Sequence, residues 1–164
     1  MPWKPEMVVL LRALMDDLYE PYEYTDDKLE ELLVYAATFV ITEVSFDTDY
    51  TIDVLRVSIS PDPTSSTTKD MDFMTLVALR AAVILSRGET KAAAAQSIKI
   101  TDGPSVVDAT MRYNAKKQLS DDLLEQYEKT KLRYQMGDGS VGKAVLSPYT
   151  QENLAARNPL RRGD

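Results

Sequence analysis

The sequence has 164 residues and a formal net charge of −7, from 26 acidic and 19 basic side chains, and it contains neither Cys nor His. The missing Cys excludes disulfides, zinc–thiolate sites and thiol nucleophiles, and the missing His removes the commonest general base and transition-metal ligand. We therefore expect no catalytic activity, no bound metal and no cofactor, and the acid excess argues against gripping nucleic-acid phosphates, although DNA could slide past such a surface.

The first sixty residues predict two helices followed by one strand. Residues 7–18 carry apolar side chains at helical spacing, and the tyrosine-rich segment 19–24, which contains a proline, ends this helix. Thr25 is a good N-cap for a second helix, which has two aspartates in its first turn and one buried apolar face. Residues 50–60 alternate between apolar and polar side chains with one slip at Leu55, so they predict a strand with a β-bulge.

A third helix is predicted to be strongly apolar. Thr67 and Asp70 have the spacing of a capping box, and the helix that follows is apolar around most of its circumference after Asp72. The alanine-rich residues 91–96 can extend this helix past Gly88. A helix of this kind lies either at the centre of a bundle or against a neighbouring subunit.

The last predicted helix is long and polar. Residues 97–101 predict a short strand that ends in a turn, and Ser105 and Asp108 then have the spacing of a second capping box. The helix reaches about Gln135, with either a continuous course or a break near Gln118. Its predicted buried side chains are mostly four residues apart, and they are Met111, Ala115, Leu119, Leu123, Leu124, Tyr127 and Tyr134.

Together these elements predict a mainly α fold: a bundle of about four helices with a small two-stranded β element and an extended C-terminal arm. Residues 1–136 form the predicted helical body, with 23 acidic and 15 basic side chains and a net charge of −8. Residues 137–164 form the predicted arm, with 3 acidic and 4 basic side chains and a net charge of +1. The arm is rich in glycine and holds only scattered apolar residues, so it should not fold alone.

Two motifs resemble ligand-binding loops, and each lacks residues that its ligand requires. Residues 137–143 match most of a phosphate-binding P-loop, but Ala144 follows the lysine and no strand precedes the loop. Residues 47–53 space three carboxylates like a calcium loop, but Ile52 stands where glycine is needed and Ser58 where the last acidic ligand belongs. We therefore interpret the first motif as a hinge and the second as a solvated connection.

The nine tyrosines have two interpretations. Aromatic side chains beside basic residues can stack on single-stranded bases, whereas tyrosines among acidic residues suit protein interfaces, where they supply buried area with a polar tip. The neighbours here are mostly acidic, which favours subunit interfaces. The predicted interface residues are Met74, Val77, Tyr113, Tyr127 and Tyr134.

The order of elements resembles the head–tail adaptor proteins of tailed bacteriophages, which are also described as head completion or connector proteins. Three segments carry the resemblance: the strand exit at 58–62, the apolar helix at 71–87, and the strand and turn at 97–104 followed by a capped helix. The resemblance covers about residues 25–135.

The resemblance implies a structural protein of the virion neck, assembled in the host cytoplasm as a homo-oligomer, with twelvefold symmetry. Such a ring sits beneath the portal protein, continues its DNA channel without sequence-specific binding, and presents a platform to a tail or nozzle protein. The arm would grip the portal, with its apolar anchors and rim charges at Leu154, Arg157, Leu160, Arg161 and Arg162.

Two other functions stay open from the sequence. The chain could be a tail-completion, stopper or other neck protein, a class usually richer in β-structure, or a non-viral helical module that binds a protein. No membrane association is expected, because the longest apolar stretch, residues 32–42, is too short to span a bilayer.

Overall fold

The computed structural model describes residues 3–65, 67, 69–96, 99–102, 105–108 and 110–137. Within these ranges the chain forms four helices and two antiparallel hairpins, which confirms the mainly α fold class. The predicted arm lies outside the described residues apart from Gly137. The elements in chain order are α1 (Trp3–Met15), α2 (Asp26–Glu43), β1 (Thr51–Asp53), β2 (Ser58–Ser60), α3 (Met71–Gln96), β3 (Lys99–Asp102), β4 (Ser105–Asp108) and α4 (Thr110–Met136).

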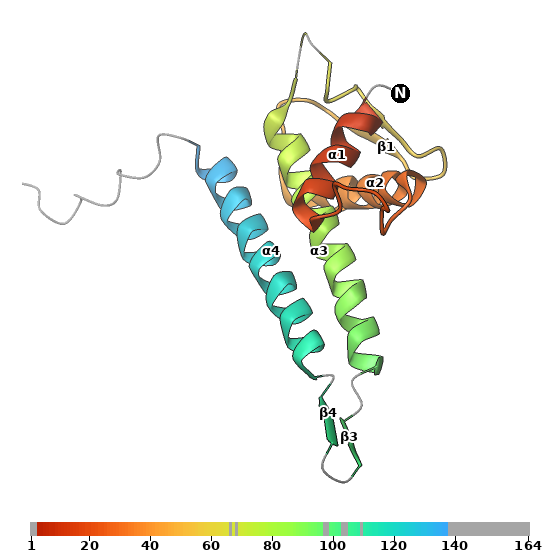
Figure 1. Ribbon diagram of the computed structural model, residues 1–164. Coiled ribbons are helices and arrows are strands. Elements are labelled where there is room, and N and C mark those ends of the chain that lie inside the picture. The colour runs from red at the N-terminus through yellow and green to blue at the C-terminus, as the bar shows by residue number, and fades with distance from the viewer. Residues whose placement is uncertain are drawn as a thin grey trace, which may run out of the picture.

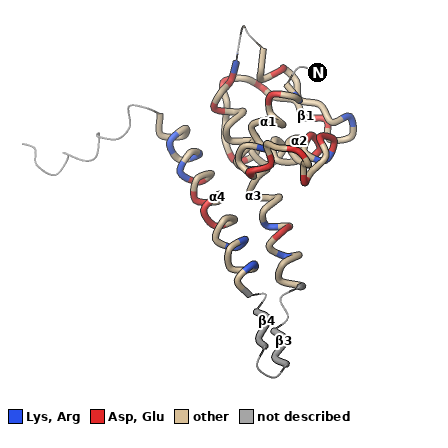
Figure 2. The backbone as a smooth tube through the Cα atoms, viewed as in Figure 1, with Lys and Arg blue, Asp and Glu red and all other residues tan. Residues whose placement is uncertain are grey.

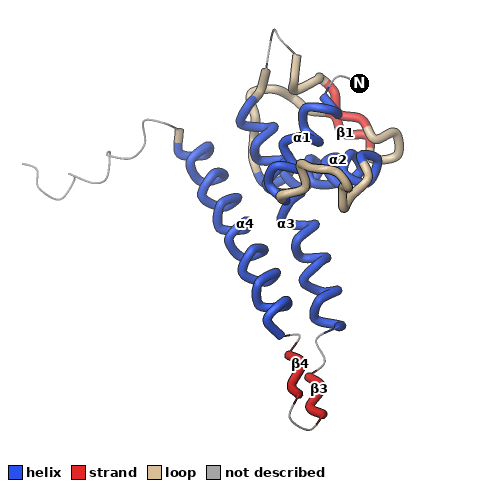
Figure 3. Tube along the Cα trace, in the orientation of Figure 1, coloured by secondary structure: helices blue, strands red, loops and turns tan. Residues whose placement is uncertain are grey.

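The elements form a head and a projecting hairpin (Figure 1). In the head, α1 and α2 pack on the first half of α3 and β1 lies against α2, whereas the second half of α3 runs outward beside the antiparallel α4. The β3–β4 hairpin joins the two helices at the far end (Figure 3). None of the described helices is long and apolar enough to cross a membrane.

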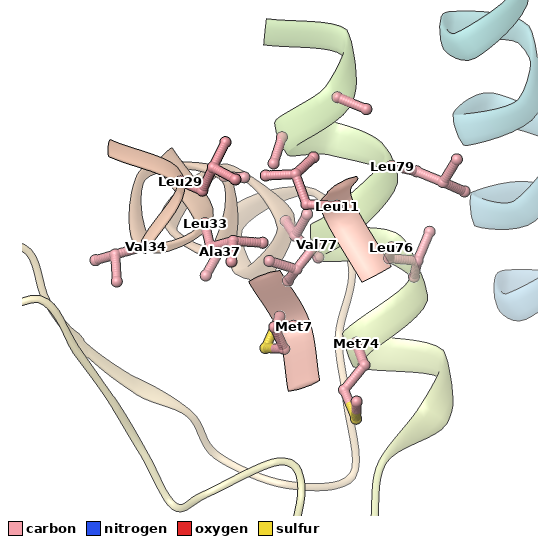
Figure 4. Packing of buried hydrophobic residues seen from close by; sticks show 14 of the residues in the cluster. Met7, Leu11, Leu29, Leu33, Val34, Ala37, Met74, Leu76, Val77 and Leu79 are labelled. Carbon is pink, nitrogen blue, oxygen red and sulfur yellow. The ribbon is translucent and has the colours of Figure 1, made fainter. Parts of the chain in front are cut away.

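The core lies where α1 and α2 pack on α3. Leu11 of α1, Leu33 of α2 and Val77 of α3 are completely buried and meet there, whereas Leu76 and Leu79 point from α3 toward α4 (Figure 4). Each such side chain contributes about 1.5–3 kcal/mol by leaving water. Of the two predicted places for the apolar third helix, the structure therefore shows the centre of the bundle, since three helices of the same chain cover it.

The first helix begins and ends earlier than its apolar pattern predicted. It starts at Trp3, because Pro5 is tolerated in the first turn, where backbone N–H groups have no helical partner. It ends at Met15, because Asp16 adopts a left-handed conformation with φ 57° and the Asp17 N–H donates back to the Arg12 carbonyl at 2.9 Å.

The predicted bulged strand at residues 50–60 is wrong, because this segment is a tight hairpin. β1 pairs with β2 so that Ile52 lies opposite Ile59. The Asp53 carboxylate accepts hydrogen bonds from the N–H groups of Leu55 and Arg56, both at 3.1 Å, and so closes the turn. The slip in the alternation at Leu55 therefore marks the turn, where that side chain is 95% exposed.

The helix starts differ in which residue caps them. Asp70 and not Thr67 caps α3, since its carboxylate accepts a hydrogen bond from the Phe73 N–H at 2.9 Å. The predicted extension past Gly88 is confirmed, because α3 runs to Gln96. Thr25 occupies the N-cap position of α2, but its side chain makes no capping hydrogen bond.

The predicted capping box at Ser105 and Asp108 is wrong, because these residues belong to β4. This strand pairs with β3 so that Ile100 lies opposite Val107, and the β-branched residues favour the strand. Helix α4 starts after it and is unbroken at Gln118. It ends at Met136 and is followed by Gly137, whose positive φ of 65° suits the left-handed position after a helix.

Candidate protein–protein interface

Helix α4 packs on α3 through a polar seam whose members alternate between three and four residues apart. The most deeply buried are Ser120, Leu123 and Tyr127, at 5%, 4% and 0% exposure. Half-buried residues continue the same spacing in both directions. The seam consists of Tyr113, Lys116, Ser120, Leu123, Tyr127, Thr130 and Tyr134. Alternation of three and four is the spacing that keeps one face of a helix against its partner.

The seam that the sequence predicted drifts away from this face. Steps of four residues advance by about 400° around a helix, so each step turns the stripe by roughly 40°. Met111, four such steps before Tyr127, therefore lies on almost the opposite side and is 77% exposed. Leu119 is 40% exposed, whereas Leu123 and Tyr127 are buried as predicted.

Glu43, at the end of α2, ties the inner part of α4 to the head. One carboxylate oxygen accepts a hydrogen bond from the Tyr127 hydroxyl at 2.8 Å and lies 3.3 Å from the Lys131 ammonium. The other oxygen pairs with the Arg80 guanidinium of α3 at 2.8 Å. The Arg80 guanidinium also lies over the Tyr127 ring, 5.1 Å from its centroid. Three helices thus converge on one carboxylate.

These contacts set the protonation of the groups involved. Burial by itself would raise the pKa of Glu43, but hydrogen bonds from Tyr127 and Lys131 and the charge of Arg80 hold that pKa below its ordinary value. Burial and the adjacent Glu43 carboxylate raise the pKa of Tyr127 well above the usual tyrosine range. Glu43 is therefore ionised and Tyr127 is a neutral donor at neutral pH.

Glu89 forms a second tie farther along α3, where the head meets the hairpin. It accepts a hydrogen bond from the Tyr24 hydroxyl and pairs with the Lys116 ammonium of α4 at 2.6 Å. Burial, followed by the hydrogen bond to Glu89, raises the pKa of the Tyr24 phenol. Beyond this point α3 and α4 continue outward without the head beside them (Figure 1).

The acidic loop, residues 16–27, comprises the connection from α1 to α2 and the first two residues of α2. It is shaped by the buried guanidinium of Arg12, which pairs with Asp17 at 2.5 Å and with Asp26 at 2.6 Å and donates to the Tyr24 carbonyl at 2.8 Å. The second oxygen of Asp17 accepts the Glu23 N–H at 2.8 Å. A buried charge with this many partners holds the loop in one shape.

The acidic loop exposes large apolar side chains beside an open hollow of about 650 Å³. Tyr19 is 84% exposed, Leu18 is 42% exposed and Tyr22 is 48% exposed, with the Tyr22 ring 4.0 Å from the Arg12 guanidinium. The hollow is lined by Arg12 and residues 20–26. Exposed aromatic surface around a concave site is typical of protein-binding regions.

Charge is segregated between the head and the hairpin (Figure 2). Residues 3–86 contain 16 acidic and 6 basic side chains, a net charge of −10. Residues 87–119, which are called the distal hairpin below, contain 3 acidic and 6 basic side chains, a net charge of +3. The outer end of the molecule therefore has the opposite sign to its head.

The sequence-predicted interface residues have different places in the structure. Met74, Val77 and Tyr127 are completely buried by other helices of the same chain, so we place these three in the core rather than at an interface. Tyr113 and Tyr134 are half-buried on the α4 seam, and their interface role stays a prediction. The predicted portal contacts, Leu154, Arg157, Leu160, Arg161 and Arg162, lie outside the described residues.

The sequence pattern favours an interface role for the tyrosines of the acidic loop, but it does not single out Leu18 or the hollow beside them. Of the loop's six acids within twelve residues, the sequence pattern places only Asp26 and Asp27 at a helix start. The density of acids around three exposed side chains, Leu18, Tyr19 and Tyr22, was the available signal.

Comparisons with protein-family models, curated proteins and solved structures found no match to this chain. Within the described part of the chain, no group of three or more acidic side chains is arranged to hold a metal ion. The proposed function therefore rests on the geometry of the head, the acidic loop and the distal hairpin.

Proposed function

We propose that this protein is a structural assembly subunit, and specifically a head–tail adaptor that forms a ring beneath the portal of a tailed bacteriophage. The observation that carries the proposal is the helical hairpin that projects from a closed head. Its outer surface presents Met111 at 77% exposure, with Leu119 and Leu132 at 40% and 51%. Exposed apolar side chains on a projecting element suit contact with another protein.

The polar character of the hairpin supports an assembly role over a catalytic one. Hydrogen bonds and ion pairs, as well as apolar contact, hold α4 to α3 and to the end of α2, which leaves the outer face of the hairpin to serve as a contact surface. The acidic head is suited to a position along a DNA channel, since negative charge repels DNA phosphates and lets the duplex pass. The helix content favours an adaptor over the β-rich stopper proteins.

Electron microscopy of the purified chain, alone and mixed with the portal protein of the same genome, tests this function. We expect closed rings on the portal, with twelvefold symmetry. A chain truncated after Leu146, which lacks the predicted portal contacts, should lose at least tenfold in portal affinity and keep its fold. A full-length chain that neither forms rings nor binds the portal would show that the proposal is wrong.

The position of the gene provides an independent check. Portal and capsid genes beside it would support a neck protein, and their absence would favour a non-viral helical module that binds a protein. Binding to a tail protein without binding to the portal would instead indicate a tail-completion or other neck protein.

A further inference from the structure

The acidic loop and the distal hairpin carry opposite charges that do not pair within the chain. On the loop, Glu20 and Glu23 form no ion pair with any described residue, and the same holds for Asp16 and Asp27. Four exposed bases of the distal hairpin are equally without a carboxylate partner among the described residues. They are Arg87, Lys91, Arg112 and Lys117.

Each of these two surfaces also exposes apolar side chains. The loop presents Tyr19 and Tyr22 beside its hollow, and the distal hairpin presents Met111, whose unbranched side chain adapts to irregular surfaces. An interface needs such an apolar centre with a charged rim, because exposed charges alone contribute little net affinity.

The loop is also held in shape before any partner arrives. The buried Arg12 guanidinium fixes both ends of the loop through Asp17 and Asp26, so docking would cost little ordering of the backbone. The distal hairpin is likewise fixed: the Glu89–Lys116 ion pair joins its two helices, and the hydrogen bond from Tyr24 to Glu89 holds its base against the head.

We propose that the distal hairpin of one copy docks on the acidic loop of a second copy of this chain. The contact joins two different surfaces, and a repeated contact of this kind closes into a ring when the rotation between copies permits. The inference rests on the proposed ring-forming function and adds to it the two surfaces that meet. Charge complementarity singles out a second copy, because both surfaces belong to the same chain and neither satisfies the other within it.

Paired charge reversals test this contact. One variant carries Arg112→Glu and Lys117→Glu, and the other carries Glu20→Lys and Glu23→Lys. Either variant alone places like charges opposite each other, so we expect self-association to weaken at least tenfold, by sedimentation velocity or by copy number on the portal. An equimolar mixture should associate as the unmodified chain does, because every hairpin in an alternating ring then meets a loop of opposite charge.

Matched controls separate this contact from a change in net charge. Arg56→Glu with Lys129→Glu lowers the net charge as much as the hairpin variant does, and Asp121→Lys with Asp122→Lys raises it as much as the loop variant does. All four positions are exposed and lie outside the two surfaces, so association should be unchanged. Circular dichroism and thermal unfolding of every variant verify the fold. A single chain with all four substitutions should also recover association.

Four other outcomes would each contradict the inference, and each would identify a different part of it as wrong. If both variants assemble like the unmodified chain, the docking surfaces are wrong while the ring-forming function stands. If the hairpin variant assembles normally but loses affinity for a 30-base-pair duplex, the basic surface meets DNA instead. If a chain ending at Gly137 loses association while the reversals do not, the C-terminal segment occupies the loop. An unmodified chain that never assembles, with or without the portal, contradicts the proposed function itself.

Discussion

Glu43 illustrates, at the scale of single residues, how one side chain can hold several elements together. Its carboxylate receives the Tyr127 hydroxyl, the Lys131 ammonium and the Arg80 guanidinium from two other helices. Removing one partner from such a group leaves the others without a counter-charge in a half-buried place, and this costs more than the loss of a surface ion pair.

Replacement of this carboxylate should weaken the docking of α4 in a pH-dependent way. Glu43→Gln should lower the free energy of unfolding by about 1–2 kcal/mol at neutral pH, since the amide keeps the size but loses the charge. The folded state lowers the pKa of Glu43, so its contribution is complete above the ordinary pKa of 4.5 and disappears as the pH falls through the folded-state value.

Urea unfolding at pH 7 and pH 3.5 measures this contribution. The difference in stability between the unmodified chain and the glutamine variant should shrink at the lower pH. A difference that stays constant between the two pH values would show that the carboxylate charge is not what Glu43 contributes.

Arg12 should be the most sensitive charged residue of the head. Arg12→Met leaves the Asp17 carboxylate, 8% exposed, without its partner, and should destabilise the fold by about 3 kcal/mol. Asp26→Asn is the matched control: it removes the other ion pair, but the Asp26 side chain is 68% exposed, so the loss should stay below about 1 kcal/mol. Equal losses in urea unfolding would contradict the central place given to the Arg12–Asp17 pair.

At the scale of elements, the spacing of the seam along α4 decides which of its side chains are buried against α3. The predicted stripe, mostly with steps of four, and the observed seam, with alternating steps of three and four, share Leu123, Tyr127 and Tyr134. They separate toward the N-terminus of the helix. Side chains with the observed spacing are buried because α3 covers one face of α4 along the length of that helix. A stripe with steps of four turns away from this face.

Two leucines on the same helix distinguish these spacings. Leu123→Ala removes a side chain that is 4% exposed and should cost about 2–4 kcal/mol in the free energy of unfolding. Leu119→Ala removes one that is 40% exposed and should cost less than about 1 kcal/mol. Similar costs for the two substitutions, measured by urea unfolding, would support the stripe and contradict the seam.

At the scale of the whole molecule, the folded body and the C-terminal segment should be energetically independent. The core is built from α1 to α4 and ends with Tyr134, whereas residues 138–164 contain few apolar side chains. We expect a chain ending at Gly137 to keep the cooperative thermal unfolding of the full chain, with a midpoint that differs by less than about 2 °C. A drop of several degrees would mean that the C-terminal segment packs on the body.

The sequence by itself determined the helical character of this protein and the burial of its third helix on most sides. Apolar side chains on nearly every side of residues 73–85 can be buried only if other elements surround them, and the polar composition of α4 restricts that helix to one covered face. These properties are local, because they depend on the periodicity of one segment and not on the identity of its neighbours.

Only the tertiary structure decided which residues meet. The turn at Asp53, the seam of α4 and the Arg12 network each depend on the geometry of one side chain relative to a backbone or partner that spacing does not specify. The distance of the outer hairpin from the head is likewise a property of the fold, because α3 carries the chain away from the head and the antiparallel α4 returns it. The two signs are already separated along the sequence, and the fold turns this separation into two ends of the molecule.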